Sequence, residues 1–149
     1  MTFPRERDGS RSRRYFRRVK NDMNPWHAHV YYDAASWARA EQLHEQLNAF
    51  LKRGSLPGLV LVGHMYDEGV GPHPKPQFEI QFYESAVPRM TELLRATGLT
   101  TLIHPLTDDD LADHTTLAQW LGDPIPLDES VLDPPGQNQG FARFGKRDF

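Results

Sequence analysis

Histidines are the residues of this sequence best suited to chemistry. The chain of 149 residues holds seven histidines and no cysteine. Neutral imidazole is the commonest protein ligand for transition metals, and its pKa near neutrality makes it the usual proton carrier. Without thiolates, a transition metal would have to be held by nitrogen and oxygen ligands. The sequence therefore predicts a metal or acid–base site at the five histidines that stand in short clusters: His27, His29, His73, His104 and His114.

The elements expected around these clusters follow the order strand, helix, strand, strand, helix, strand. Hydrophobic periodicity and turn residues place strands at 27–32, 59–65, 78–83 and 100–104, and helices at 37–51 and 85–97. Thr107 resembles a capping residue, so a third short helix is expected to run from there to about 120–122. This order predicts a ferredoxin-like α+β sandwich (βαββαβ), with an antiparallel sheet and helices on one face.

The histidines are expected to share the other face of that sheet. Side chains alternate along a strand, so His27 and His29 point the same way, away from the helices. The same alternation places Glu79 and His104 on their face, and ferredoxin-like topology sets strand one between strands three and four. His73 approaches from a loop rich in proline and glycine. Two or three imidazoles with a carboxylate and open coordination positions are typical of non-heme iron(II) oxygenases.

Each of these residues also has a plain structural interpretation. Two histidines spaced by one residue on a strand are often surface or interface side chains, and Glu79 can pair with an arginine. Asp113 beside His114 either orients that imidazole or forms a helix-surface pair. His44, inside the first helix, and His64, at the end of the second strand, are expected to lie outside the site.

The chain is expected to form one folded domain with two less regular ends. Residues 1–24 carry eight arginine and lysine residues and predict a solvated basic arm, without nucleic-acid or membrane binding. Residues 25–128 form the predicted domain, and residues 129–149 an irregular C-terminal tail. No apolar run is long enough to span a bilayer or act as a secretory signal, so the expected location is the cytoplasm.

The expected architecture also bears on assembly. With the helices on one side, the opposite face of a four-stranded sheet stays bare unless a second subunit or the tail covers it. Because bare apolar surface of that extent is unfavourable in water, we expect a homodimer.

The histidine clusters, taken together, resemble the DOPA 4,5-dioxygenase family. The segments that carry the resemblance are His27-Ala28-His29-Val30-Tyr31-Tyr32, Gly71-Pro72-His73-Pro74, Phe78-Glu79-Ile80, Ile103-His104-Pro105, Asp113-His114-Thr115 and Trp120-Leu121-Gly122. The similarity covers residues 25–128. It implies a small ferredoxin-like enzyme that opens the ring of a catechol, such as DOPA or a related compound, next to its two hydroxyls, using iron(II) and O2.

The resemblance also implies roles for the clustered residues. His29, His73 and His104 lead the expected metal-ligand set, and His27 and Glu79 compete for membership. A histidine that does not bind the metal, His114 or His27, would take the second phenolic proton and return it during ring opening. His114, His27 and Glu79 are therefore the expected catalytic residues.

Two other functions fit the same residues. The first is a non-catalytic dimeric module that binds a small aromatic ligand on the histidine face. The second is a zinc-dependent enzyme, for hydrolysis or isomerisation, on the same site, because zinc accepts nitrogen and oxygen ligands equally well.

Overall fold

The sheet at the centre of the molecule has five strands, all paired antiparallel. The structure is a computed structural model and describes residues 21–146, so the basic arm expected over residues 1–24 lies outside it except for its last four residues. The strands are β1 (Pro25–Tyr31), β2 (Leu59–Val62), β3 (Gln77–Tyr83), β4 (Thr101–Pro105) and β5 (Gln119–Leu121). Their order is β2-β3-β1-β4-β5, which confirms the ferredoxin-like α+β fold and adds β5 at one edge.

Strand β1 occupies the centre of the sheet, between β3 and β4, as the topology predicted. Its register places His27 opposite Gln81 on β3 and His104 on β4. His29 stands opposite Glu79 in the same way. The backbone hydrogen bonds of three strands thus fix the spacing of the polar side chains on this face before any side-chain contact is made.

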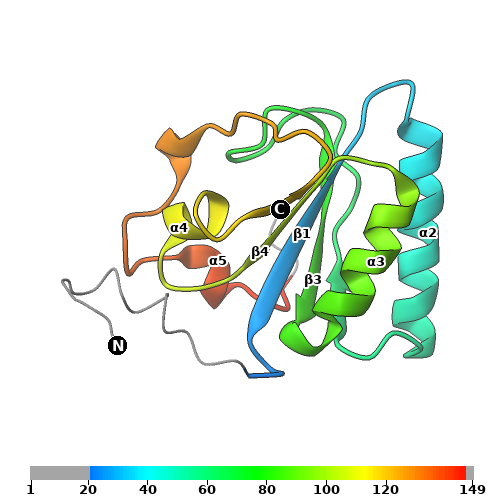
Figure 1. Cartoon of the computed structure of the whole chain (residues 1–149), viewed down its shortest axis with the longest axis horizontal. Helices are drawn as coiled ribbons and strands as arrows, with labels where there is room; N and C mark the ends of the chain where they lie inside the picture. Colours follow the sequence, from blue (N-terminus) through cyan, green and yellow to red (C-terminus); the bar gives the residue numbers. More distant parts are fainter. Residues whose placement is uncertain (1–20, 147–149) are drawn as a thin grey trace.

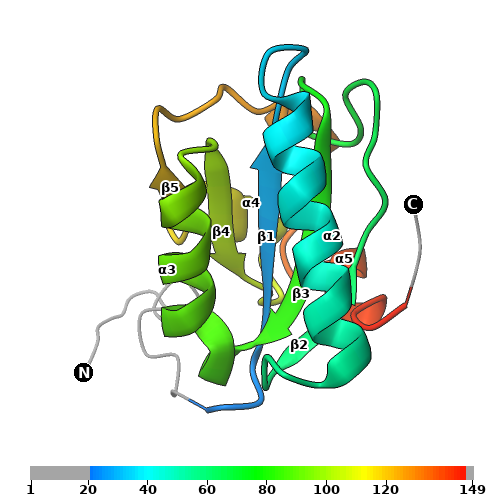
Figure 2. The same cartoon turned by 90° about the vertical axis from the view of Figure 1, so that its right-hand side faces the viewer.

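Two long helices cover the other face of the sheet. They are α2 (Trp37–Arg53) and α3 (Val87–Thr97), which lie side by side on the same side of the strands (Figures 1 and 2). Both end at a glycine with positive φ, Gly54 at 66° and Gly98 at 72°, a conformation that glycine adopts without strain. The core between the layers is apolar and fully enclosed, and includes Ala28, Val30, Leu47, Phe78, Ile80, Phe82, Met90 and Leu94. Within residues 21–146, no helix has the length and apolar character needed to cross a membrane.

The C-terminal part of the chain covers the histidine face. The short helices α4 (Asp110–His114) and α5 (Gln139–Ala142) lie on the side of the sheet opposite α2 and α3 (Figure 1), and a 3-10 turn, η2, spans Glu129–Val131. The tail therefore shields this face within a single chain. The argument that led to a homodimer no longer applies, and the oligomeric state stays a prediction that light scattering can test.

The third helix is much shorter than the sequence predicted. It was expected from Thr107 to about 120–122, but α4 ends at His114, and residues 119–121 form β5 along the edge of β4. Asp109 caps the helix by accepting a hydrogen bond from the backbone N–H of Ala112 at 3.0 Å. The Thr107 hydroxyl instead donates to the Asp113 carboxylate at 2.7 Å. Pairing with an open strand edge, a long-range contact, outweighed the local helical pattern.

Candidate metal centre

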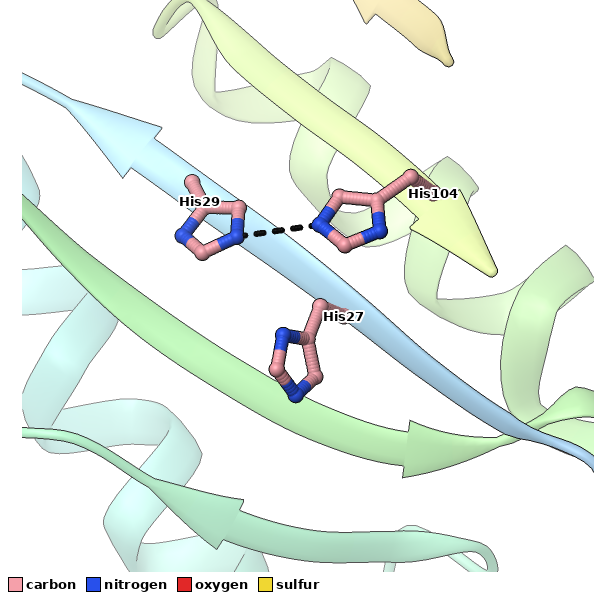
Figure 3. Close-up of side chains that lie close together, drawn as sticks. All are labelled: His27, His29 and His104. Atoms are coloured by element: carbon pink, nitrogen blue, oxygen red, sulfur yellow. Dashed lines mark hydrogen bonds between the residues drawn. The ribbon is translucent and has the colours of Figure 1, made fainter. Parts of the chain in front are cut away.

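Five histidines from four parts of the chain converge on the covered face of the sheet. His27 and His29 project from β1 and His104 from the neighbouring β4 (Figure 3), while His73 enters from the loop before β3 and His114 from the end of α4. The ring centroids of His29 and His73 lie 4.1 Å apart, and those of His104 and His114 lie 4.4 Å apart. The first four side chains are buried. The expectation that these histidines meet in one cluster is confirmed.

His29 and His104 point their Nε2 atoms at each other across 3.1 Å (Figure 3). The Nδ1–H of His104 donates to the Pro105 carbonyl oxygen at 2.7 Å, and that of His29 donates to Gln77 Oε1 at 3.1 Å. A neutral imidazole has only one N–H, so both Nε2 atoms present lone pairs. Two facing lone pairs repel unless a cation lies between them. Nitrogens bound to one metal at ~2.1 Å stand roughly 3.0–3.4 Å apart, so this pair fits a metal ion.

His27 brings a third nitrogen of the same kind. Its Nδ1 lies 3.4 Å from Glu79 Oε1, and the other oxygen of Glu79 accepts a hydrogen bond from Gln81 Nε2 at 2.7 Å. Its Nε2 is buried, and nothing within residues 21–146 forms a hydrogen bond with it. Leaving a buried polar atom unpaired costs about 1–3 kcal/mol. Coordination of a metal would remove that cost.

The histidines form two overlapping groups with metal-ligand spacing. His27, His29 and His104 make one group, and His29, His73 and His114 make the other; within each, the ligand atoms lie within 4.8 Å of one another. The expected ligand set of His29, His73 and His104 takes one member from each group in addition to the shared His29. That assignment stays a prediction.

His73 and His114 are held by hydrogen bonds of their own. The Tyr31 hydroxyl lies 2.6 Å from His73 Nδ1. His114 Nδ1 donates to the backbone oxygen of Asp110 at 2.8 Å and lies 3.3 Å from its carboxylate. The carboxylate that orients His114 thus belongs to Asp110, one helical turn earlier, and not to the neighbouring Asp113 considered from the sequence.

Burial controls the charge of the cluster. It lowers the pKa of His27 and that of His73 to about 3, and nearby histidines lower them further. Burial likewise holds the pKa of His29 and that of His104 well below the ordinary value. These imidazoles are therefore neutral at physiological pH, which is the form that binds metals.

His114 differs from the other four histidines. Burial alone would lower its pKa, but the hydrogen bonds and the negative charge of Asp110 outweigh burial and raise the pKa above the ordinary value. His114 thus holds a proton more readily than its neighbours, which suits a group that carries protons.

Asp113 ties α4 to the C-terminal segment. Its carboxylate is fully buried and accepts hydrogen bonds from the backbone N–H and hydroxyl of Thr107 and from Nδ2 of Asn138 at 3.1 Å. Burial raises the pKa of Asp113 to about 7. Because both oxygens of Asp113 accept hydrogen bonds from these donors, its role is to hold the tail over the site.

His44 and His64 lie outside the cluster, as expected. His44, on α2, donates through Nε2 to the Gly63 carbonyl oxygen at 2.7 Å. His64 is exposed, and its ring packs against Tyr66 with 4.1 Å between centroids. His64 therefore offers a matched control for substitutions within the cluster.

A cavity of about 270 Å³ opens beside the five histidines. Its apolar and backbone walls come from the loop before β3 and from the C-terminal segment, at Gly71, Pro72, Leu106, Val131, Leu132 and Gly140. Its remaining polar lining is Glu79, Asp110, Asp133, Asn138, Gln139 and Arg143. An engineered cavity of ~150 Å³ is large enough for benzene, so this cavity accommodates a single substituted ring.

Several residues that line the cavity or hold its histidines, such as Gln77 beside His29, were not found from the sequence. Gln77 could have been, because it precedes Glu79 by two positions on the same strand face. Asp133, Asn138 and Arg143 carry no local signal, since they lie in a segment expected to be irregular and reach the site only through the folding of the tail.

Comparison with known proteins gives the family of the chain. The sequence model of the Dopa 4,5-dioxygenase family matches residues 26–131. The DOPA 4,5-dioxygenase of Amanita muscaria is 29% identical over 138 residues, which cover 83% of this chain and 60% of that protein. An uncharacterised 21.2 kDa protein of Botryotinia fuckeliana is 30% identical over 79 residues, 45% of this chain and 42% of its own length. The chain thus matches less than two thirds of the length of each of these curated relatives, 60% of the first and 42% of the second.

A solved structure agrees with this match. The crystal structure of a candidate dioxygenase from Nostoc punctiforme is similar with a TM-score of 0.64 and 31% identity, over 74% of this chain and 91% of the other. The family match includes all five clustered histidines, because it runs from Trp26 to Val131. The chain belongs to the Dopa 4,5-dioxygenase family.

Proposed function

We propose that this protein is an extradiol-type ring-cleaving dioxygenase that acts on a catechol, such as DOPA or a related compound, with non-heme iron(II) and O2. The observation that carries the proposal is the pair of Nε2 lone pairs of His29 and His104, 3.1 Å apart beside a cavity of single-ring size. Membership of the Dopa 4,5-dioxygenase family supports the reaction class.

His27, His29 and His104 are the residues best placed to hold the metal. All three project from adjacent strands, and each has its Nδ1 directed at a carbonyl, amide or carboxylate oxygen, which leaves Nε2 for coordination. This choice replaces His73, expected from the sequence, with His27, whose buried Nε2 lacks a partner within residues 21–146. Bound iron(II) would supply O2 activation and lower the pKa of the catechol hydroxyls.

His114 is the residue best suited to receive the second phenolic proton. Its Nδ1–H is committed to Asp110, so the neutral ring offers Nε2 as a base toward the cluster. The raised pKa of His114 favours acceptance of the proton by this ring over the other histidines of the cluster. Glu79 contributes by positioning His27.

Oxygen uptake by iron-loaded protein tests the function directly. Protein purified and loaded with iron(II) without oxygen is expected to consume one O2 per DOPA or 4-methylcatechol and to give a ring-opened product that contains both oxygen atoms. The variant His104→Ala should lose bound iron and uptake together, whereas His64→Gln should keep both.

The other two functions predict different results in the same experiment. Protein that binds zinc but not iron, and takes up no oxygen, would indicate a zinc-dependent enzyme. Protein that binds catechols with no metal and no uptake would indicate a non-catalytic ligand-binding module. Either result would refute the dioxygenase.

A further inference from the structure

We propose that Tyr31 fixes His73 as a hydrogen-bond donor, and that the Nε2–H of His73 binds an oxygen anion of the catechol. The proposal rests on the proposed function and names a further residue that contacts the substrate. It also gives a physical reason why His73 is not a metal ligand. Tyr31 belongs to β1 and His73 to the loop before β3, and both side chains are buried.

A short hydrogen bond joins the two side chains. The Tyr31 hydroxyl lies 2.6 Å from His73 Nδ1, and it has no other hydrogen-bond partner among residues 21–146. If Nδ1 carried the proton of the ring, the hydroxyl would accept, and its own O–H would be buried without an acceptor. Leaving a buried donor unpaired is unfavourable. The Tyr31 hydroxyl therefore donates, and His73 Nδ1 accepts.

This direction fixes the tautomer of His73. A neutral imidazole has a single N–H, so a ring that accepts at Nδ1 carries its proton on Nε2. Nε2 is the nitrogen that remains for the cavity, which His73 lines, and no acceptor among residues 21–146 receives its N–H. His29 and His104 have the opposite tautomer, because each donates through Nδ1. His73 thus offers a donor where these two neighbours offer lone pairs.

The tautomer also decides between the two groups of histidines with metal-ligand spacing. The group of His29, His73 and His114 requires a lone pair from each ring. His73 has none to give, because Nδ1 accepts from Tyr31 and Nε2 carries the proton. The metal is therefore left to the other group, whose three histidines all project from β1 and β4.

Backbone contacts hold the loop that carries His73. The N–H of His73 donates to the Val70 carbonyl oxygen at 3.0 Å, and the N–H of Asp128 donates to that of Pro72 at 2.9 Å. Gly69 allows the loop to close this tightly, since a Cβ atom there would lie 2.5 Å from the backbone oxygen of His73. The imidazole thus extends from a fixed position.

Tyr31 is held independently of its hydroxyl. Its ring stacks on Trp120 with 5.9 Å between centroids and an interplanar angle of 20°. Its backbone N–H donates to the Thr100 carbonyl oxygen at 3.0 Å. The substitution Tyr31→Phe therefore removes the hydrogen bond to His73 and keeps the packing of the ring.

His73 and His114 bring opposite chemistry to the same cavity. Both line it, with 6.2 Å between their ring centroids. His114 donates through Nδ1 to Asp110, so its Nε2 accepts, whereas Nε2 of His73 donates. A catechol with one hydroxyl deprotonated matches this pair: the oxygen anion accepts from His73, and the remaining hydroxyl faces His114. Hydrogen bonds to a charged oxygen are roughly twice as strong as those between neutral groups, so this donor fits an oxygen anion best.

Nitrogen NMR of the histidine rings tests the tautomer in metal-free, full-length protein, without reference to any reaction. The 15N shift of a protonated ring nitrogen is well separated from that of a nitrogen with a lone pair. His73 should carry its proton on Nε2, whereas His29 and His104, in the same spectrum, should carry theirs on Nδ1. The variant His73→Gln assigns the His73 signals. A proton on Nδ1 of His73 would overturn the proposal.

Tyr31→Phe tests what fixes this tautomer. The shift of His73 Nδ1 should move in that variant, because the nitrogen loses its donor. Tyr32→Phe is the matched control: the hydroxyl of this neighbouring buried tyrosine donates to the Tyr66 carbonyl oxygen at 2.7 Å, and Tyr32 does not line the cavity. It should leave the His73 signals unchanged. The same Nδ1 shift in wild-type and Tyr31→Phe protein would remove Tyr31 from the proposal.

Iron content distinguishes a hydrogen-bond donor from a ligand. His73→Leu should keep the iron content of the wild-type protein, whereas His104→Ala should lose it. Loss of iron from His73→Leu would show that His73 is a ligand and would overturn the proposal.

Catechol binding measures the contact itself. 4-Methylcatechol is titrated by calorimetry into full-length, iron(II)-loaded protein without oxygen. It should bind roughly tenfold to 100-fold more weakly to His73→Leu than to the wild-type protein, because one hydrogen bond to a charged oxygen is lost. His73→Gln, whose amide can donate from a similar position, should keep part of the affinity. Equal affinity of the wild-type protein and His73→Leu would refute the contact.

Oxygen uptake separates this inference from the proposed function. If His73 has the expected tautomer and His73→Leu binds catechol more weakly, but the wild-type protein consumes no oxygen, the assignment of His73 stands and the dioxygenase is refuted. If the wild-type protein consumes oxygen, but His73→Leu has lost its iron or binds catechol as tightly as before, the dioxygenase stands and the assignment of His73 is refuted.

Discussion

His29 and His104 face each other across neighbouring strands, with 3.1 Å between their Nε2 atoms and both Nδ1 atoms held by oxygen acceptors. The acceptors come from β3 and from the backbone of β4, so the sheet itself sets the tautomer and the direction of each ring. The two imidazole rings are therefore preorganised for a cation, because little side-chain entropy remains to be lost when the cation binds.

Removing either member of the pair should abolish tight metal binding. His29→Ala and His104→Ala are expected to lower the metal content at least tenfold, since each removes one strong ligand. Elemental analysis after dialysis against a weak chelator measures the effect. His64→Gln, on an exposed histidine outside the cluster, should match the wild-type protein.

The metal-free protein should become less stable as the pH falls below neutrality. The pKa values of His27, His29, His73 and His104 are lowered in the folded state, whereas the unfolded chain takes up protons near the ordinary value of 6.5. The unfolded state therefore binds more protons between pH 6.5 and about 3, and stability is lost on acidification through that range.

The expected loss between about pH 7.5 and about pH 5.5 is roughly 1.4 kcal/mol for each such histidine. Urea unfolding of chelator-treated protein at the two pH values measures it. His73→Gln should reduce the loss by about the contribution of one histidine. A free energy of unfolding that is the same at both pH values would contradict the neutral, buried state of the cluster.

Asp110→Asn should slow catalysis while leaving the metal in place. The substitution keeps the size of the side chain but removes the charge 3.3 Å from His114 Nδ1, so the pKa of His114 should fall and the ring should lose part of its orientation. Loss of such a supporting carboxylate typically costs about 10-fold to 100-fold in activity. The pH profile of kcat should move with it. A variant that loses metal instead would show that His114 is a ligand.

Asn138→Ala should loosen the C-terminal segment. The substitution removes the hydrogen bonds to Thr107 and Asp113 and leaves a buried carboxylate with one donor fewer, at a cost of about 1–3 kcal/mol. Chemical unfolding gives the loss, and hydrogen exchange should increase at 133–146 while β1 stays protected. Gln137→Ala, at an exposed neighbouring position, is the control.

The sheet and its histidine face were predictable because alternation and topology act together. Period-two patterning placed His27, His29 and Glu79 on one face, and the ferredoxin-like order then required β1 to lie beside β3 and β4. The helix ends at Gly54 and Gly98 followed equally from the sequence, because glycine is favoured where φ is positive.

The covering of that face was not predictable in the same way. The edge pairing of Trp120 with Leu102 and the bonds between Asn138 and Asp113 depend on contacts between residues far apart in sequence, which leave no periodic pattern. The residue that orients His114 was missed for the same reason. From the sequence we considered the adjacent Asp113, whereas the structure shows Asp110, which lies four residues earlier and on the same side of the helix as His114.

The division of the site between two parts of the chain bears on how such proteins diverge. Three of the five imidazoles sit on the inner strands β1 and β4. Residues 132–146, which lie outside the stretch matched to the family, contribute much of the opposite wall of the cavity. Changes in that short ending can alter which molecules enter without disturbing the reactive centre. Within this lineage, new substrate ranges should therefore arise first at the carboxyl end of the polypeptide.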